Sequence, residues 1–399
     1  MARLSTAAAG GFLLAAFLSV TFVMRGPVTS VGPLAHEICD AMAVGWDAYG
    51  TLSALPIAAF GIFSFIAPSL VRRFGLWGGI AAALLILFAG AVLRMAANWS
   101  VLLAATAFVG AGIAVLNVLM PVVVKTVWVQ KSGPMMGLYT GVIGSSGAVG
   151  GLLAAPLLAL SGTLALPFGF WALAAGVAIL FWTLARTRPG AEVMRREVHP
   201  KAEGKPKAAF AAMLADPLAW ALTAVMGLQS LTIYTAAAWM PPFWQSLGMS
   251  ASETGFWIFV YLLSGLPASV FTPKFMKLVG NDAVSGILLS LIYLAGLLGW
   301  IAGGVWMFPA SVAAGASQGA MLSVAFLLMA QKSADMRRML GISSMAQGIG
   351  YLGAGCGPWI FAMLYETTAA WTLPFIFFGT VLVLWGLAVV ATAFKERLD

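Results

Sequence analysis

Twelve apolar stretches, each about 20 to 30 residues long, follow one another along this chain with short polar segments between them. A helix of about 20 apolar residues crosses the hydrocarbon core of a bilayer. Of the 399 residues, 61% are hydrophobic and 9% are charged, against about 25% charged in soluble domains. We therefore predict an all-α, multi-pass membrane protein with twelve transmembrane helices. The predicted spans are 9–38, 49–70, 76–95, 100–123, 135–158, 166–186, 217–240, 254–274, 283–303, 306–329, 340–364 and 370–394.

Basic residues are divided unequally between the two ends of these spans. All of the 21 lysines and arginines except Arg25 and Arg94 fall at one end, which also carries both termini. Because cytoplasmic segments carry an excess of basic residues, we expect both termini in the cytoplasm of a bacterial inner (plasma) membrane. This distribution accounts for the net charge of +8 without a nucleic-acid partner. Arg94, near the outer end of its span, is expected to snorkel to the interface.

An internal repeat appears when the chain is compared with itself at an offset of about 205 residues. The matches combine glycines, prolines and basic residues and indicate two pseudo-symmetric six-helix halves, 1–186 and 216–399, joined by a charged cytoplasmic linker, 187–215. Duplicated halves facing a site at mid-membrane are typical of secondary transporters. The matched pairs are Gly50 with Gly255, Pro68 with Pro273, Arg72 with Lys277, and Gly75 with Gly280.

Arg25 lies inside the first apolar stretch and is followed by Gly26, Pro27, Gly32 and Pro33. A charged side chain near the centre of a membrane helix is costly and usually faces a cavity or a partner. Glycine and proline weaken the helix there, so that freed backbone groups can line water or a ligand. A snorkelling arginine at a helix end is the alternative. A signal peptide is disfavoured, because its charge precedes the apolar core.

Several stretches carry a family resemblance. They are Met24-Arg25-Gly26-Pro27, Thr29-Ser30-Val31-Gly32-Pro33-Leu34, Ala91-Val92-Leu93-Arg94, residues 116–125, and Met345-Ala346-Gln347-Gly348-Ile349-Gly350. With the repeat and the basic loops, they resemble the cyanate and 2-nitroimidazole permease branch of the major facilitator superfamily. The resemblance implies the major facilitator fold and a cyanate-like or nitroimidazole-like solute. One departure is residues 71–75, Val-Arg-Arg-Phe-Gly, which lack the acidic residue that the superfamily usually carries in this loop.

Catalytic and metal-dependent functions find no support in the sequence. His36 and His199 are predicted on opposite sides of the membrane, and no phosphate-binding G-x-x-x-x-G-K-[ST] motif is present. We predict no enzyme activity, no cofactor and no metal site. The expected function is secondary active or facilitative transport of a small anionic or nitro-bearing solute by alternating access, by a monomer in the lipid bilayer. The alternatives are a drug-type exporter of hydrophobic compounds and a non-transporting membrane receptor or scaffold.

Polar residues predicted deep in the spans are the candidates for solute binding. The guanidinium of Arg25 offers a planar fork of donors suited to a flat or linear anion or a nitro group. For the amide side chains an interhelical hydrogen bond is the alternative, and it is favoured for Gln318. Aromatic residues near outer helix ends are assigned to an interfacial belt, namely Tyr49, Trp239 and Trp244. The predicted solute-binding residues are Arg25, Asn117, Gln229, Tyr234 and Gln347.

Coupling and gating are predicted from charged residues near the helix ends. None of the 13 acidic residues falls in the middle of a span, where proton-driven transporters usually hold a carboxylate. Glu37 with His36, at the outer end of the first span, is the possible site of proton coupling. At the inner end, basic residues at matching positions of the two halves can cap helix C-termini when that side is closed. These gating candidates are Arg72, Arg73, Lys274 and Lys277.

Overall fold

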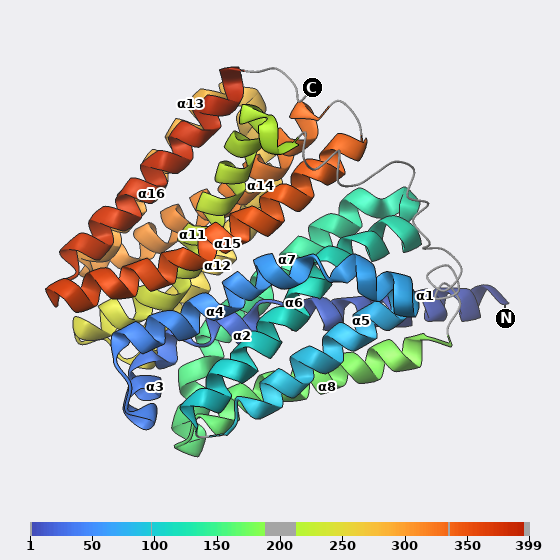
Figure 1. Ribbon diagram of the computed structural model, residues 1–399, viewed down its shortest axis with the longest axis horizontal. Helices are drawn as coiled ribbons and strands as arrows, with labels where there is room; N and C mark the ends of the chain where they lie inside the picture. The colour runs from blue at the N-terminus through green and yellow to red at the C-terminus, as the bar shows by residue number, and fades with distance from the viewer. Residues whose placement is uncertain (1, 97, 188–212, 334–335, 395–399) are drawn as a thin grey trace.

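The computed structural model describes residues 2–96, 98–187, 213–333 and 336–394, and the long elements in them are helices (Figure 1). Twelve of the described helices have 19 residues or more, one for each predicted span. The first span is divided among four elements, α1 (Ala2–Phe22), α2 (Gly26–Thr29), the 3₁₀ turn η1 (Gly32–Leu34) and α3 (Ala35–Met42). The others are α4 (Trp46–Ser64), α5 (Ala67–Leu93), α6 (Trp99–Val127), α7 (Ser132–Ser161), α8 (Ala165–Ala185), α11 (Pro217–Ser246), α12 (Ala251–Val279), α13 (Asp282–Ala302), α14 (Met307–Lys332), α15 (Met336–Thr368) and α16 (Thr372–Ala391).

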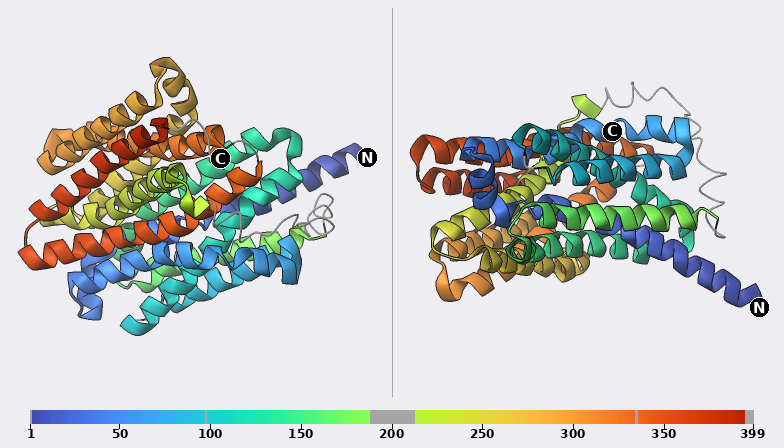
Figure 2. Two further views of the ribbon diagram at one scale, coloured as in Figure 1. Left: turned by 45° about the horizontal axis from the view of Figure 1, so that its top comes forward. Right: turned by 90° about the horizontal axis from the view of Figure 1, so that it is seen from below.

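The long helices run side by side along one axis, as two further views show (Figure 2). Within the described residues, ten segments are long and apolar enough to cross a membrane, and α4 and α15 are the long helices outside this set. These two helices pack extensively against each other, so that a large part of their surface faces protein. A helix that is partly shielded from lipid tolerates more polar residues.

Two helix pairs join the first six long helices to the last six, α4 with α15 and α7 with α12. The sequence repeat matches Gly50 of α4 with Gly255 of α12. Each lies at a close helix crossing in one of these pairs, Gly50 against Ala362 and Gly255 against Gly151. Gly75 and Gly280, also matched by the repeat, adopt positive φ angles of 71° and 70°. The division at 187–215 stays a prediction, because 188–212 lie outside the described residues.

The two ends of the bundle differ in charge and in packing. We call the end that carries Glu37, Asp40, Asp47, Glu253 and Glu366 the acidic end. The opposite end, with Arg72, Arg73, Lys125, Lys274 and Lys277, is the basic end.

At the acidic end, contacts from one half to the other close the space between them. The Tyr49 hydroxyl of α4 donates to the Ala238 carbonyl of α11 at 2.8 Å. The Gln245 amide of α11 donates to the Pro33 carbonyl at 2.9 Å. An aromatic cluster fills the same region, with ring centroids 4.3 to 6.4 Å apart between neighbours; it consists of Trp46, Tyr49, Trp239, Phe361, Tyr365 and Trp371.

The interfacial belt predicted for Tyr49, Trp239 and Trp244 is wrong, because all three side chains are fully buried within the protein. Position near a helix end does not distinguish lipid-facing aromatic rings from rings that pack between helices.

Candidate solute-binding site

The first membrane-spanning segment is interrupted at mid-depth, as the glycines and prolines predicted. α1 ends at Phe22, and the short α2 begins at Gly26, so the residues between them leave the regular helical hydrogen-bond pattern. Pro27 and Pro33 stand in the first turns of α2 and η1, where a missing N–H costs least. We call residues 23–34 the helix break. Arg25 lies within it, as the N-cap residue of α2.

Side chains and carbonyls of α7 satisfy the polar groups that the helix break leaves free. The Ser146 hydroxyl accepts from the Gly26 N–H at 2.9 Å and donates to the Phe22 carbonyl. The Thr29 hydroxyl donates to the Gly147 carbonyl at 2.8 Å. The break is therefore fastened to α7 on both sides of Arg25.

Arg25 extends from the break toward the second half of the protein. Its Nη2 donates to the hydroxyl of Tyr234 on α11 at 3.4 Å, and its Cζ lies 5.6 Å from the centre of the tyrosine ring. The aliphatic stem passes over Gly147, where an added Cβ would lie 3.0 Å from the arginine Cγ. Two predicted solute-binding residues, one from each half, are thus in contact.

The charge of Arg25 is not balanced by a carboxylate in the described part of the chain. Its neighbours are the phenol groups of Tyr234, Tyr351 and Tyr139. A neutral hydroxyl solvates the guanidinium but does not neutralise it. Arg25 is half-buried, and a partly desolvated cation without a carboxylate partner is stabilised by an opposite charge, so the site favours a bound anion.

A cavity of about 90 Å³ lies beside Arg25, between the helix break and the second half. From the second half it is lined by Tyr261, Gln318, Ser269 and Ser323, and Thr140 of α7 faces it from the first half. Thr140, Ser269 and Ser323 lie toward the basic ends of their helices, so the cavity extends from Arg25 toward that end. Its polar groups can hold a small solute by one charged contact and a few hydroxyls or amides.

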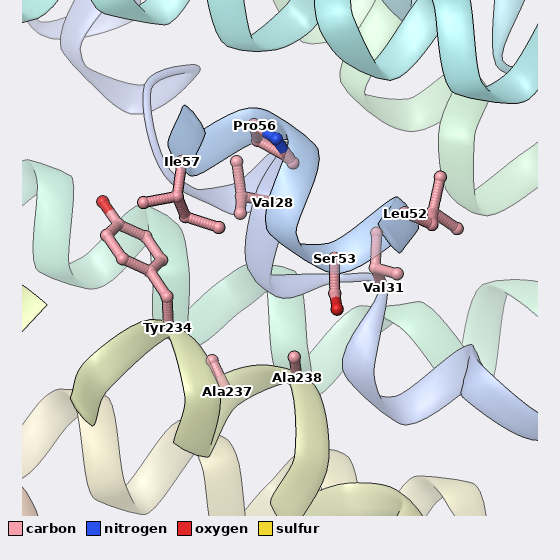
Figure 3. A pocket seen from close by; sticks show the side chains of 9 residues that line it. All are labelled: Val28, Val31, Leu52, Ser53, Pro56, Ile57, Tyr234, Ala237 and Ala238. Atoms are coloured by element: carbon pink, nitrogen blue, oxygen red, sulfur yellow. The ribbon is translucent and has the colours of Figure 1, made fainter. Parts of the chain in front are cut away.

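A second cavity, of about 10 Å³, is lined in part by Tyr234 and has room for about one water molecule (Figure 3). Tyr234 and Leu52 stand at opposite ends of its lining, and Val28 of the helix break lies between them. Tyr234 therefore borders this small cavity and also contacts Arg25, which is absent from the cavity's lining.

Gln229 and Gln318 belong to a hydrogen-bonded network inside the second half. The Gln318 amide donates to the Gln229 side-chain oxygen at 3.1 Å and to its carbonyl at 3.0 Å. The Gln318 oxygen accepts from Thr232 at 2.9 Å and from Tyr261 at 3.4 Å, and Tyr261 is 2.7 Å from the Tyr293 hydroxyl. The interhelical bond favoured for Gln318 is confirmed. Sequence analysis did not identify Gln318 and Tyr261 as cavity-lining residues.

The remaining predicted binding residues lie apart from the cavity. Asn117 on α6 is half-buried, and Gln347 on α15 donates to Ser343 of its own helix at 2.9 Å. Neither side chain lines the two cavities described here. Their role in solute binding stays a prediction.

The gating candidates at the basic end are exposed and make no contact with each other across the halves in the described residues. Arg72 donates to Ser69 of its own helix at 2.7 Å, and Arg73 lies over the Phe74 ring. Lys274 and Lys277 are also exposed. Their gating role concerns a state in which this end is closed, and it stays a prediction.

His36 and Glu37 lie at the acidic end, in the first turn of α3. The His36 ring packs edge-on against Trp46, with centroids 4.8 Å apart. His36 Nε2 and Glu37 Oε2 are buried and have no hydrogen-bond partner among the described residues. Buried polar atoms without a hydrogen-bond partner are uncommon in proteins. Proton coupling through this pair stays a prediction.

The snorkelling predicted for Arg94 is wrong, because only 3% of its surface is exposed. Its Nη1 donates to the Pro27 carbonyl in the helix break at 2.6 Å, and its Nε donates to the Thr106 hydroxyl at 3.0 Å. An arginine near the end of an apolar span is compatible with either arrangement, and only tertiary packing decides between them.

The sequence was compared with protein-family models and with known proteins. The sequence model described as Major Facilitator Superfamily matches residues 10–351. The chain is 30% identical to the uncharacterized transporter YycB of Bacillus subtilis (strain 168), over 94% of this chain and 92% of the relative. It is 26% identical to the 2-nitroimidazole transporter of Escherichia coli (strain K12), covering 91% and 90%, and 25% identical to the cyanate transport protein CynX of the same organism, covering 93% and 94%.

Solved structures resemble the fold at lower sequence identity. A bacterial homologue of the human lysosomal transporter Spinster, in an inward-facing and unoccupied conformation, matches with a TM-score of 0.71 at 16% identity, over 97% of this chain and 95% of that one. A POT family transporter in complex with 5-aminolevulinic acid matches with a TM-score of 0.74 at 12% identity, over 94% and 95%. At these identities the likeness shows the fold alone.

Proposed function

The chain belongs to the Major Facilitator Superfamily, a family of membrane transporters, and from this premise we propose that its solute is a small anion or nitro compound held by Arg25. The observation that carries the proposal is the unbalanced guanidinium at the edge of the cavity. A charge-assisted hydrogen bond contributes about 1.5 to 3 kcal/mol, which corresponds to roughly 10- to 150-fold in affinity.

The two E. coli relatives support this chemistry. One is named for 2-nitroimidazole and the other for cyanate. A nitro group and a cyanate ion share small size and terminal atoms that carry partial or full negative charge. The planar fork of Arg25 can donate two parallel hydrogen bonds to such a group, whereas lysine offers a point charge.

Export of drug-sized hydrophobic compounds is the second candidate, and the apolar part of the cavity lining favours it. Leu262, Leu266, Leu322 and Phe326 contribute to that lining. Pockets for drug-sized ligands are usually about 300 to 1,000 Å³, several times the 90 Å³ found beside Arg25. The volume therefore supports the smaller solute. Family membership disfavours a non-transporting receptor or scaffold.

We further propose that the basic end faces the cytoplasm of a bacterial inner membrane and that the protein acts as a monomer. The excess of lysine and arginine at that end supports the orientation. Since the acidic end is closed by the contacts of Tyr49 and Gln245, the cavity would then be reached from the cytoplasm.

Flux into liposomes containing the purified protein tests the proposed solute class. We expect uptake of labelled cyanate and of 2-nitroimidazole, and much less uptake of imidazole, which has a similar ring but no nitro group. A solute that crosses the lipid bilayer unaided would also accumulate, so each uptake rate is compared with the rate in protein-free liposomes. Equal uptake rates for 2-nitroimidazole and imidazole, together with no uptake of cyanate, would contradict the proposal.

A further inference from the structure

We propose that Arg94 is a positioning residue that holds Arg25 at the cavity by fixing the carbonyl of Pro27. The inference rests on the proposed function insofar as Arg25 is the solute contact. Arg94 lies at the C-terminal end of α5, and its guanidinium reaches the helix break, two residues along the chain from Arg25. It thereby joins the break to the α5–α6 pair, just as Ser146 joins it to α7.

The Pro27 carbonyl is available because the helix does not continue. α2 ends at Thr29, and the Val31 N–H, which would bond Pro27 in a regular helix, approaches the Val28 carbonyl instead, at 3.5 Å. The Ser30 hydroxyl is a weak partner for Pro27 at 3.4 Å, so the 2.6 Å bond from Arg94 is the strong one. A charged donor compensates a buried carbonyl better than a neutral one.

Two contacts partly stabilise the charge of Arg94, although its Nη2 is buried without a hydrogen-bond partner among the described residues. The residue caps the C-terminus of the 27-residue α5, where the helix dipole favours a cation. Its Cζ lies 5.2 Å from the centre of the Phe168 ring, which adds a cation–π contact. Arg94 is absent from the lining of the cavity beside Arg25, so its effect on the solute is transmitted through the backbone of the break.

The geometry needs an arginine and not merely a positive charge. Nη1 and Nε donate in two directions, to Pro27 and to Thr106, from one rigid plane. A lysine at this position can reach one of these acceptors and leaves the other without its donor. Arg94→Lys is therefore expected to retain part of the effect, and Arg94→Met to lose it.

The test uses purified full-length protein in lipid nanodiscs and two independent readouts. The first is the dissociation constant of cyanate. The second is the rate at which phenylglyoxal modifies Arg25, followed by peptide mass spectrometry, with the exposed Arg72 as internal reference. The matched control is Arg186→Met, which removes an exposed arginine at the end of α8.

In Arg94→Met we expect cyanate affinity to fall about tenfold and the modification of Arg25 to change by at least about threefold, with smaller changes in Arg94→Lys. Both readouts within about twofold of wild type in monodisperse Arg94→Met would overturn the inference. If wild type does not bind cyanate but Arg25 reactivity still changes, the positioning role stands and the proposed solute class fails. Should Arg94→Met not fold, Arg94→Gln, which keeps a polar side chain and removes the charged fork, decides by the same two readouts: an unchanged Arg25 rate overturns the inference.

Discussion

The two halves differ most at mid-depth of their first long helices. In the first half the segment is broken, and it presents Arg25 to a cavity without a carboxylate partner. At the offset of 205 residues, Arg25 falls on Ser230 of α11, a continuous helix at this depth, where the neighbouring Gln229 is bonded to Gln318. One half thus presents a cation without a carboxylate partner beside the cavity, whereas in the other Gln229 and Gln318 pair with each other.

This difference indicates that the two halves have different roles, with the proposed charged solute contact in the first half and an uncharged, hydrogen-bonded surface in the second. Breaking a helix frees backbone groups and allows a side chain to leave the regular helix surface, but every freed group needs a partner. Ser146, Gly147 and Arg94 supply those partners around Arg25. The unbroken helix α11 frees no backbone groups at this depth and therefore needs no such partners.

The largest effect should follow removal of the unbalanced charge. We expect Arg25→Ala to weaken cyanate binding by at least about 100-fold, and Arg25→Lys by about tenfold, because lysine keeps the charge and loses the planar fork. Isothermal titration with purified protein measures both. Affinities close to wild type in both variants, with unchanged thermal stability, would show that the contrast between the halves has no bearing on binding.

The second prediction concerns the network in the other half. Gln318→Ala should lower the melting temperature, because buried groups on Gln229 and Thr232 lose a partner, at a cost of about 1 to 2 kcal/mol. The double variant Gln229→Leu with Gln318→Leu removes both amides and should recover part of the loss. A melting temperature that does not respond, together with lost cyanate binding, would instead place Gln318 among the solute contacts.

The third prediction uses two glycines of the same helix. An added Cβ at Gly147 would press on the stem of Arg25, whereas nothing lies within 4 Å of one at Gly141. Gly147→Ala should therefore displace the guanidinium and lower cyanate affinity by about threefold, and Gly141→Ala should leave it unchanged. Equal effects of the two substitutions on the dissociation constant would point to a general change in α7 packing.

Hydropathy was sufficient to predict the helical fold, and glycine and proline to predict the break at Arg25. Those signals are local, since a run of apolar residues or a missing N–H acts on the chain around it. The environments of Arg94, Tyr49 and Trp239 were not predictable in the same way. Each depends on which helices, distant in sequence, pack beside it, and one sequence does not encode that choice in its local pattern.

The smallest effect is expected at the acidic end, and it concerns coupling. Among the described residues neither half carries a carboxylate at mid-depth, so the candidate proton carrier is Glu37 of α3, whose Oε2 is buried and has no hydrogen-bond partner in the same part of the chain. Cyanate stays ionised between mildly acidic and neutral pH, so it carries no proton of its own there. We expect no uphill accumulation of cyanate in liposomes with an imposed pH gradient, and the same flux in wild type, Glu37→Gln and the control Asp40→Asn, an exposed carboxylate on the same helix. Accumulation in wild type and in Asp40→Asn that disappears in Glu37→Gln would make Glu37 the proton carrier. It would also place the second essential charge of the transport cycle at the closed acidic end, away from the Arg25 cavity.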